Sequence, residues 1–110
     1  MNDYATLLDR VDGLSPLLGG EDRRHAERVV ALCRELVQRP RSDGKLIVAA
    51  RDLDLKRELG RLTELLGRRA TYALPAATLG RAALADLSGD KSALRATCLD
   101  CDAKLAMLGH

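Results

Sequence analysis

Aromatic and β-branched side chains are scarce in this sequence. Its 110 residues include no Phe, no Trp, two Tyr, one Ile and five Val. Strands favour β-branched and aromatic residues, because these side chains fill the surface of a pleated sheet. The composition therefore argues against a β-sheet protein.

Long apolar runs and clusters of charge are also missing. No stretch approaches the roughly 20 apolar residues that a membrane-spanning helix needs, and the start Met-Asn-Asp-Tyr lacks the basic and apolar segments of a signal peptide. The net charge is only +2, and basic pairs such as Arg23-Arg24 and Arg68-Arg69 are too short for a phosphate-binding stripe. We expect a cytoplasmic protein that binds neither membranes nor nucleic acid.

The three cysteines are too few, and odd in number, for a disulfide framework. Cys98 and Cys101 form a C-x-x-C, a spacing that binds zinc or exchanges disulfides in other proteins. A structural zinc site needs four ligands, and only Cys33, His25 and His110 could complete the set. Both cysteines fall on the apolar stripe of a predicted helix. We interpret them as core residues and keep a metal- or thiol-dependent regulator as the alternative.

Catalytic patterns are absent. His25 has no Ser or Cys placed beside it as a nucleophile, and no two carboxylates stand at a defined catalytic spacing. Gly19-Gly20 does not belong to a phosphate-binding fingerprint, because no strand precedes it. We therefore expect a protein that is not an enzyme and has no cofactor, no catalytic residue and no metal site.

Leucine and alanine dominate what is present, with 22 and 16 residues. Both lose little side-chain freedom in a helix, so the sequence predicts an all-α protein. Apolar residues recur at helical spacing, and Gly, Pro or a capping residue separates the segments. The predicted helices run from Asn2 or Asp3 to Leu14, over Glu21–Arg39, from about Lys45 to Leu53, from a cap at Asp54 to Gly67, over Ala76–Leu87, and from a cap at Asp90 to Gly109.

The segment Leu46 to Ala50 could also form a buried strand, but no second strand is available to pair with it. We read it as a helix. Gly67 fits the left-handed closing position of its helix. Short loops such as Pro40 to Gly44 make successive helices antiparallel neighbours. The sequence thus predicts five to six short helices, stacked as antiparallel hairpins in one domain over residues 1–110.

A small stack of hairpins exposes apolar surface at its ends and on its concave side, which indicates a module that binds an amphipathic helix. A further set of short segments follows one another along the chain: Leu18-Gly19-Gly20, His25-Ala26-Glu27, Cys33-Arg34-Glu35-Leu36, Leu46-Ile47, Leu53, Leu62 to Leu66, Tyr72-Ala73-Leu74-Pro75, Leu84, Gly89 and Ser92-Ala93-Leu94. In these segments and their order, the sequence resembles the small TPR-like chaperones of type III secretion needle subunits, the YscG/PscG group.

The resemblance implies a bacterial cytoplasmic chaperone with a TPR-like fold. Such a protein sequesters the amphipathic helix of a needle subunit, together with a small helical co-chaperone, and so prevents premature polymerisation. On this basis we expect the partner to contact a groove. The predicted contact residues are Tyr72, Leu74, Leu79 and Leu84, with Leu46, Ile47 and Leu62 as further candidates.

Overall fold

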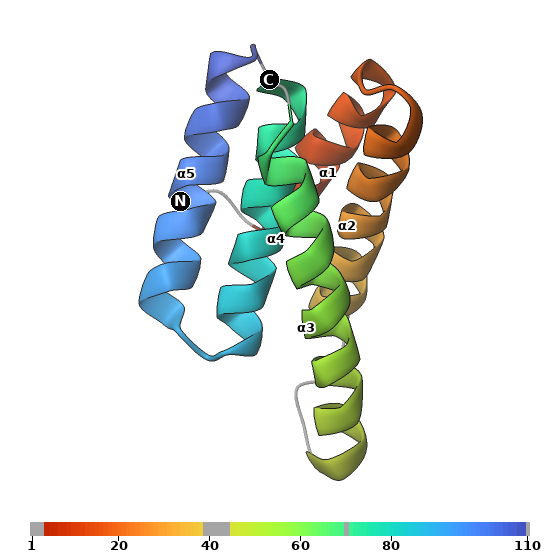
Figure 1. The fold of residues 1–110 in the computed structure, drawn as a ribbon. Coiled ribbons are helices and arrows are strands. Elements are labelled where there is room, and N and C mark those ends of the chain that lie inside the picture. Colours follow the sequence, from red (N-terminus) through yellow and green to blue (C-terminus); the bar gives the residue numbers. More distant parts are fainter. Residues whose placement is uncertain (1–3, 39–44, 70, 110) are drawn as a thin grey trace.

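The computed structural model describes residues 4–38, 45–69 and 71–109, and the side chains of all of these except 37, 38 and 45–52. The described backbone is almost wholly helical and contains no strand (Figure 1). This confirms the predicted all-α fold. The α-helices are α1 (Tyr4–Leu14), α2 (Gly20–Gln38), α3 (Lys45–Gly67), α4 (Leu74–Leu87) and α5 (Lys91–Met107), and 3-10 turns cover Ser15–Leu17 and Thr71–Ala73.

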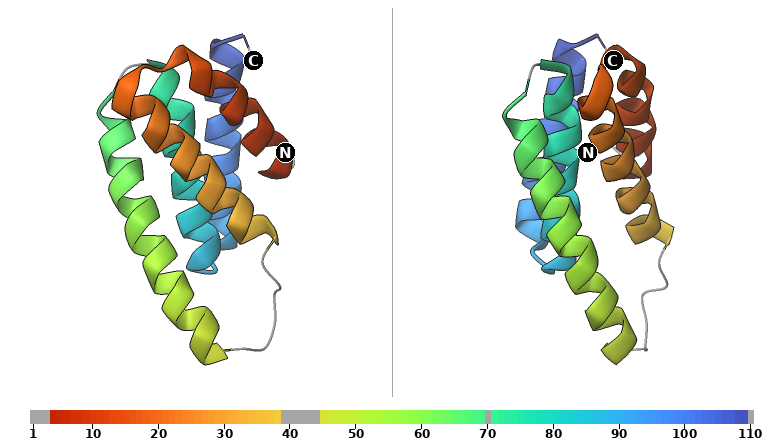
Figure 2. Two further views of the ribbon diagram at one scale, coloured as in Figure 1. Left: turned by 90° about the vertical axis from the view of Figure 1, so that its right-hand side faces the viewer. Right: turned by 45° about the vertical axis from the view of Figure 1, so that its right-hand side comes forward.

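Successive helices run in opposite directions and form two layers (Figures 1 and 2). In one layer α4 lies between α3 and α5. In the other, α2 packs over α3 and α4, and α1 packs over α4 and α5. Each pair of consecutive helices is therefore an antiparallel hairpin, and α4 is the central helix of the fold.

Helix α4 can hold this central position because its side chains are small. Ala76, Ala77, Ala82 and Ala83 are all buried, as is Gly80. Small side chains let neighbouring helices approach α4 from several directions without leaving voids. Four of the chain's alanines thus lie where close packing of the helices requires small side chains.

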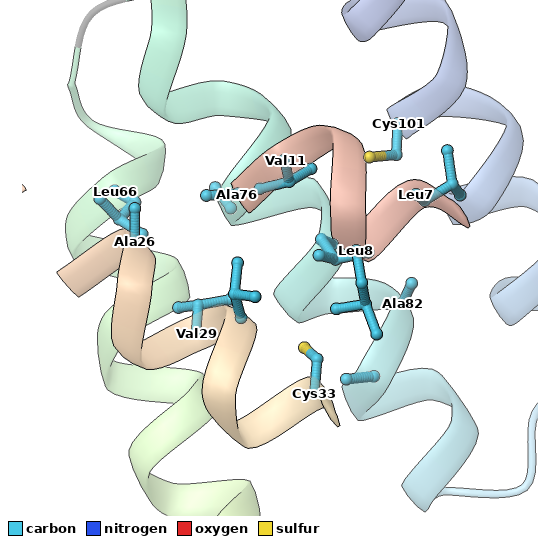
Figure 3. Close-up of a cluster of buried hydrophobic side chains, with 14 of the residues drawn as sticks. Leu7, Leu8, Val11, Ala26, Val29, Cys33, Leu66, Ala76, Ala82 and Cys101 are labelled. Carbon is cyan, nitrogen blue, oxygen red and sulfur yellow. The ribbon is translucent and has the colours of Figure 1, made fainter. Parts of the chain in front are cut away.

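The core lies between the two layers (Figure 3). Leu7, Leu8 and Val11 of α1 meet Cys101 of α5 and Ala82 of α4 in this cluster. On the α2 side, further leucine and valine side chains fill the space toward α3 and α4. The largest fully buried aliphatic side chains are Leu7, Leu14, Leu59, Leu62, Leu66, Leu79, Leu105, Val11, Val29 and Val30.

The predicted division between a helix ending at Leu53 and another beginning at Asp54 is wrong. Helix α3 runs through both positions without interruption, and Asp54 is an exposed residue in its interior. An aspartate can cap the start of a helix. It marks the end of a preceding helix only where glycine, proline or a competing turn also interrupts the backbone hydrogen bonds. No such residue stands near Asp54. The predicted cap at Asn2 or Asp3 and the loop Pro40 to Gly44 lie outside the described residues.

The junction between α4 and α5 follows the prediction closely. Asp90 caps α5 by accepting a hydrogen bond from the Ala93 backbone N–H at 2.9 Å. Gly89, with φ of 75°, closes α4, and the Asp90 N–H donates to the Ala85 carbonyl at 3.0 Å. This is the hydrogen-bond pattern of a Schellman motif, which needs a residue in the left-handed region. The sequence predicts that Gly67 closes α3 in the left-handed conformation. This prediction is wrong, because the φ of Gly67 is not positive.

Candidate partner-binding surface

A small pocket of about 150 Å³ opens between the second half of α2 and the middle of α3. Pockets that bind drug-sized ligands or cofactors have volumes of roughly 300 to 1,000 Å³, so this pocket suits one or two protein side chains better than a cofactor. We call it the α2–α3 pocket. Its walls are formed by Arg28, Leu32, Glu35, Asp54, Leu55 and Glu58.

The α2–α3 pocket combines an apolar base with an acidic rim. Leu32 and Leu55 are almost completely buried, whereas Asp54 is exposed and Glu35 and Glu58 are partly exposed. Arg28 supplies the single positive charge of the lining. The lining thus contains three carboxylates and one guanidinium group.

Arg28 and Glu58 form a two-pronged ion pair across the α2–α3 boundary. The Nε and Nη2 atoms of Arg28 donate to Oε1 and Oε2 of Glu58 at 2.5 and 3.1 Å. Hydrogen bonding to Arg28 holds the pKa of the Glu58 carboxyl below its usual range. The pairing satisfies Arg28, so the carboxylate of the lining that remains for a partner is that of Asp54, which has no ionic partner among the described residues.

The first turns of α3 extend beyond the ends of the neighbouring helices (Figures 1 and 2). The sequence of this extension includes the five apolar residues from Leu46 to Ala50. Leu53 follows, and 49% of its surface is exposed, although it adjoins the pocket residues Asp54 and Leu55. Among the described helices, none lies beside these first turns of α3, which lead directly to the α2–α3 pocket (Figures 1 and 2).

Two of the predicted partner contacts belong to the core instead. Leu62 of α3 is 1% exposed and Leu79 of α4 is 0% exposed. Both lie on faces that are covered by neighbouring helices, so neither offers surface to a partner in this structure. The error arises because a leucine seam has the same spacing whether it packs inside the fold or against a second protein.

The other predicted contacts do not come together in one groove. Tyr72 is 41% exposed in the turn before α4, and Leu74 begins that helix with its side chain partly buried. Leu84 lies about 15 Å further along α4, at 1.5 Å per residue, and packs partly against the core. The side chains of Leu46 and Ile47 are outside the described part of the structure, although their backbone forms part of α3.

Sequence reasoning missed the α2–α3 pocket. One signal was present: Leu32 widens the apolar stripe of α2 beyond the positions Val29, Val30 and Cys33. A widened stripe indicates that a helix contacts two neighbours rather than one. The acidic rim could not be found in the same way, because it depends on how α2 and α3 are aligned with each other.

All three cysteines are buried and reduced. The Cys101 thiol donates a weak hydrogen bond to the Pro75 carbonyl, with the sulfur 3.6 Å from the oxygen. Burial raises the pKa of Cys33 and of Cys101 to about 12, and it also raises the pKa of Cys98. Metal ligation and thiol exchange both require the thiolate, so these surroundings favour a packing role.

Within the described residues, no group of three or more His, Cys, Asp or Glu side chains is close enough together to hold a metal ion. His25 is partly buried near the start of α2. None of the helices in the described ranges combines the length and the apolar character that crossing a membrane requires.

The chain matches no protein-family model, no curated protein and no solved structure.

Proposed function

We propose that this protein is a chaperone that binds an amphipathic helix and keeps it from assembling prematurely. The observation that carries the proposal is the extension of α3 beside the α2–α3 pocket, where apolar sequence, the exposed Leu53 and the exposed carboxylate of Asp54 meet. In line with the sequence resemblance, the partner is the needle subunit of a type III secretion system, bound together with a small helical co-chaperone in the bacterial cytoplasm.

The partner helix would lie along the first turns of α3 with its apolar face toward Leu53 and the pocket. Leu32 and Leu55 form the apolar base of that pocket. A basic side chain of the partner would interact with Asp54, which has no ionic partner among the described residues. An apolar face covered in this way is unavailable for contacts between needle subunits, so polymerisation is blocked until the partner is released.

The metal- or thiol-dependent alternative gains no support from the geometry. It would require thiolates at Cys98 and Cys101, whereas burial raises the pKa of both thiols. Measuring the metal content of the purified protein tests this alternative directly. Stoichiometric zinc would favour it over the chaperone role.

The chaperone proposal is tested by co-expressing the chain with a needle subunit from the same operon and measuring binding by calorimetry. Leu53→Asp places a charge on the proposed docking surface, and we expect it to weaken binding at least tenfold. Leu17→Asp is the matched control, because Leu17 is 53% exposed but lies in the 3-10 turn before α2. We expect this variant to bind as the wild type does.

Two results would contradict the proposal. In one, the chain binds no needle subunit from its operon. In the other, Leu53→Asp and Leu17→Asp bind equally well, which would place the contact elsewhere on the molecule. Circular dichroism of both variants shows whether either substitution disturbs the fold.

A further inference from the structure

Helix α5 has apolar residues on two opposite sides. Its inner side, which includes Cys98, Cys101 and Leu105, is buried against α4 and α1. The outer side is also free of charge over four turns, yet all of its side chains are exposed. This outer seam consists of Ser92, Ala96, Leu99, Ala103 and Ala106, with successive steps of four, three, four and three.

Besides its alanines, the outer seam contains one large apolar side chain, and a second lies beside it. Leu99 is 50% exposed in its middle, and Met107 is 85% exposed beside its end. Helix α5 forms one edge of the three-helix layer, with α4 on its other side (Figure 1). Among the described helices none covers the outer seam.

The spacing of the seam is that of the contact positions in a two-stranded coiled coil. Taking Ala96 and Ala103 as positions a, and Leu99 and Ala106 as positions d, places Arg95 at g and Asp100 at e. These two residues therefore stand on opposite flanks of the seam, five positions apart. In a parallel pair of helices, the g residue of one chain faces the following e residue of the other.

The charges at these positions are complementary between two parallel copies. Arg95 has no ionic partner among the described residues. Asp100 is half exposed and accepts a hydrogen bond from Lys104 Nζ at 2.6 Å, which leaves its second oxygen available. A parallel arrangement about a two-fold axis would pair Arg95 with Asp100 of the second copy twice. An antiparallel arrangement would instead bring the two Asp100 side chains near each other, which is unfavourable.

We propose that the outer seam of α5 binds the same seam of a second copy of this chain, with the two helices parallel. The alanines allow the backbones to approach closely, and Leu99 supplies the central apolar contact. A seam of about two heptads is short, so the interface falls at the small end of specific interfaces. We therefore expect a dimer that dissociates on dilution rather than a permanent one.

Sedimentation velocity at increasing protein concentration tests the proposal. The wild-type chain should shift from monomer to dimer, and Leu99→Asp should remain monomeric at every concentration. Leu17→Asp, an equally exposed leucine outside the seam, should dimerise like the wild type. A wild-type chain that stays monomeric at all concentrations would overturn the proposal.

Charge reversal tests the direction of the two helices. Arg95→Asp alone and Asp100→Arg alone should each weaken dimerisation at least tenfold, because each places like charges together. The double variant should recover most of the lost affinity, since it restores opposite charges across the same pair. A double variant that dimerises no better than either single one would exclude the parallel pairing.

Cross-linking gives a measurement that does not depend on affinity. Ala103→Cys places a thiol at a position where the two copies face each other, so mild oxidation should yield a covalent dimer. Glu64→Cys on the outer face of α3, with its side chain 69% exposed, is the control and should cross-link much less. Equal cross-linking of the two variants would show random collision rather than pairing through α5.

The seam could instead serve the proposed helical partner. In that case Leu99→Asp would abolish binding of the needle subunit while the free chain stayed monomeric, a result that contradicts self-association. Dimerisation does not rest on the chaperone proposal, because it is measured with the purified chain alone.

Discussion

Gly80 of α4 lies directly against the hydroxyl group of Thr63 in α3. A β-carbon added to Gly80 would overlap Oγ1 of Thr63 at a distance that real carbon atoms do not show. The Thr63 hydroxyl is buried and has no hydrogen-bond partner among the described residues. The absence of a side chain at Gly80 thus sets how closely the two helices approach.

Replacing Gly80 by alanine should destabilise the protein, although alanine has the higher helix propensity. Overpacking of a tight helix contact costs about 1 to 3 kcal/mol, which exceeds the propensity gain of about 1 kcal/mol. Urea denaturation measures the change in the free energy of unfolding. Combining Gly80→Ala with Thr63→Ala should remove the overlap, so the double variant should be more stable than Gly80→Ala alone.

Gly60→Ala is the matched control for this helix pair. Gly60 lies in the interior of α3, and a β-carbon added there meets no atom within 4 Å. We expect this variant to be more stable than the wild type by up to about 1 kcal/mol, because alanine lowers the entropy of the unfolded chain. Similar losses at both glycines would show that the contact with Thr63 is not the cause.

The cap of α5 should contribute measurably to stability. Asp90→Ala removes the acceptor of the Ala93 N–H, and the loss of such a cap costs roughly 0.5 to 2 kcal/mol. Asp90→Asn keeps an oxygen acceptor and should retain most of the stability. Thermal unfolding followed by circular dichroism compares the variants, and equal melting temperatures for both would contradict a capping role.

The sequence predicted this cap because its signals are local. Asp90 follows a glycine and precedes an apolar stripe with helical spacing. The same spacing predicted that Cys98 and Cys101 lie in the middle of the last helix, on its buried side. The break at Asp54 was wrong because a capping residue is also compatible with an exposed site inside a helix. Local signals identify possible helix ends. Whether a helix ends at one of them depends on whether the backbone hydrogen bonds continue through it.

The partner contacts were harder to predict because they depend on tertiary alignment. Leu62 and Leu79 have the spacing of a helix contact, and only the central place of α4 shows that the contact is internal. The acidic rim joins Glu35 of α2 to Asp54 of α3, which are 19 positions apart in the chain. No spacing rule within one helix could bring them together.

Buried thiols should make the protein less stable at high pH. The pKa of Cys33 and of Cys101 is raised to about 12 in the folded chain, chiefly by burial, from an ordinary value near 9. The unfolded chain therefore loses these protons first. The stabilisation is complete below about pH 9 and is lost as the pH rises toward 12, at about 1.4 kcal/mol per pH unit for each thiol.

Urea denaturation between pH 8 and about pH 11 measures this loss. Cys33→Ala and Cys101→Ala should each be less stable than the wild type at pH 8, because each leaves a cavity. In each variant the free energy of unfolding should also fall less steeply with pH, since one titrating thiol is gone. If the free energy falls as steeply in both variants as in the wild type, other groups cause the pH dependence.

The proposed chaperone role predicts that a bound needle subunit stabilises the chain. A ligand that binds only the folded state adds about 2.7 kcal/mol when its free concentration is a hundred times its dissociation constant. For a chain of this size, that corresponds to an increase in melting temperature on the order of 10 °C. The chain expressed alone should accordingly be the less heat-resistant form, and the increase should grow with the concentration of subunit.

Asp54→Lys tests whether the acidic rim takes part in that stabilisation. The substitution reverses a charge on an exposed position in the interior of α3, so the free protein should keep its melting temperature within about 2 °C. The increase in melting temperature on adding the subunit should be smaller for the variant than for the wild type. Raising the salt concentration should reduce this increase more in the wild type than in the variant. Arg24→Glu, which reverses an exposed charge near the start of α2, is the control and should leave the increase unchanged. An increase that is the same in all three proteins would mean that the rim does not contact the subunit, because a charge that faces a basic partner cannot be reversed without weakening the complex.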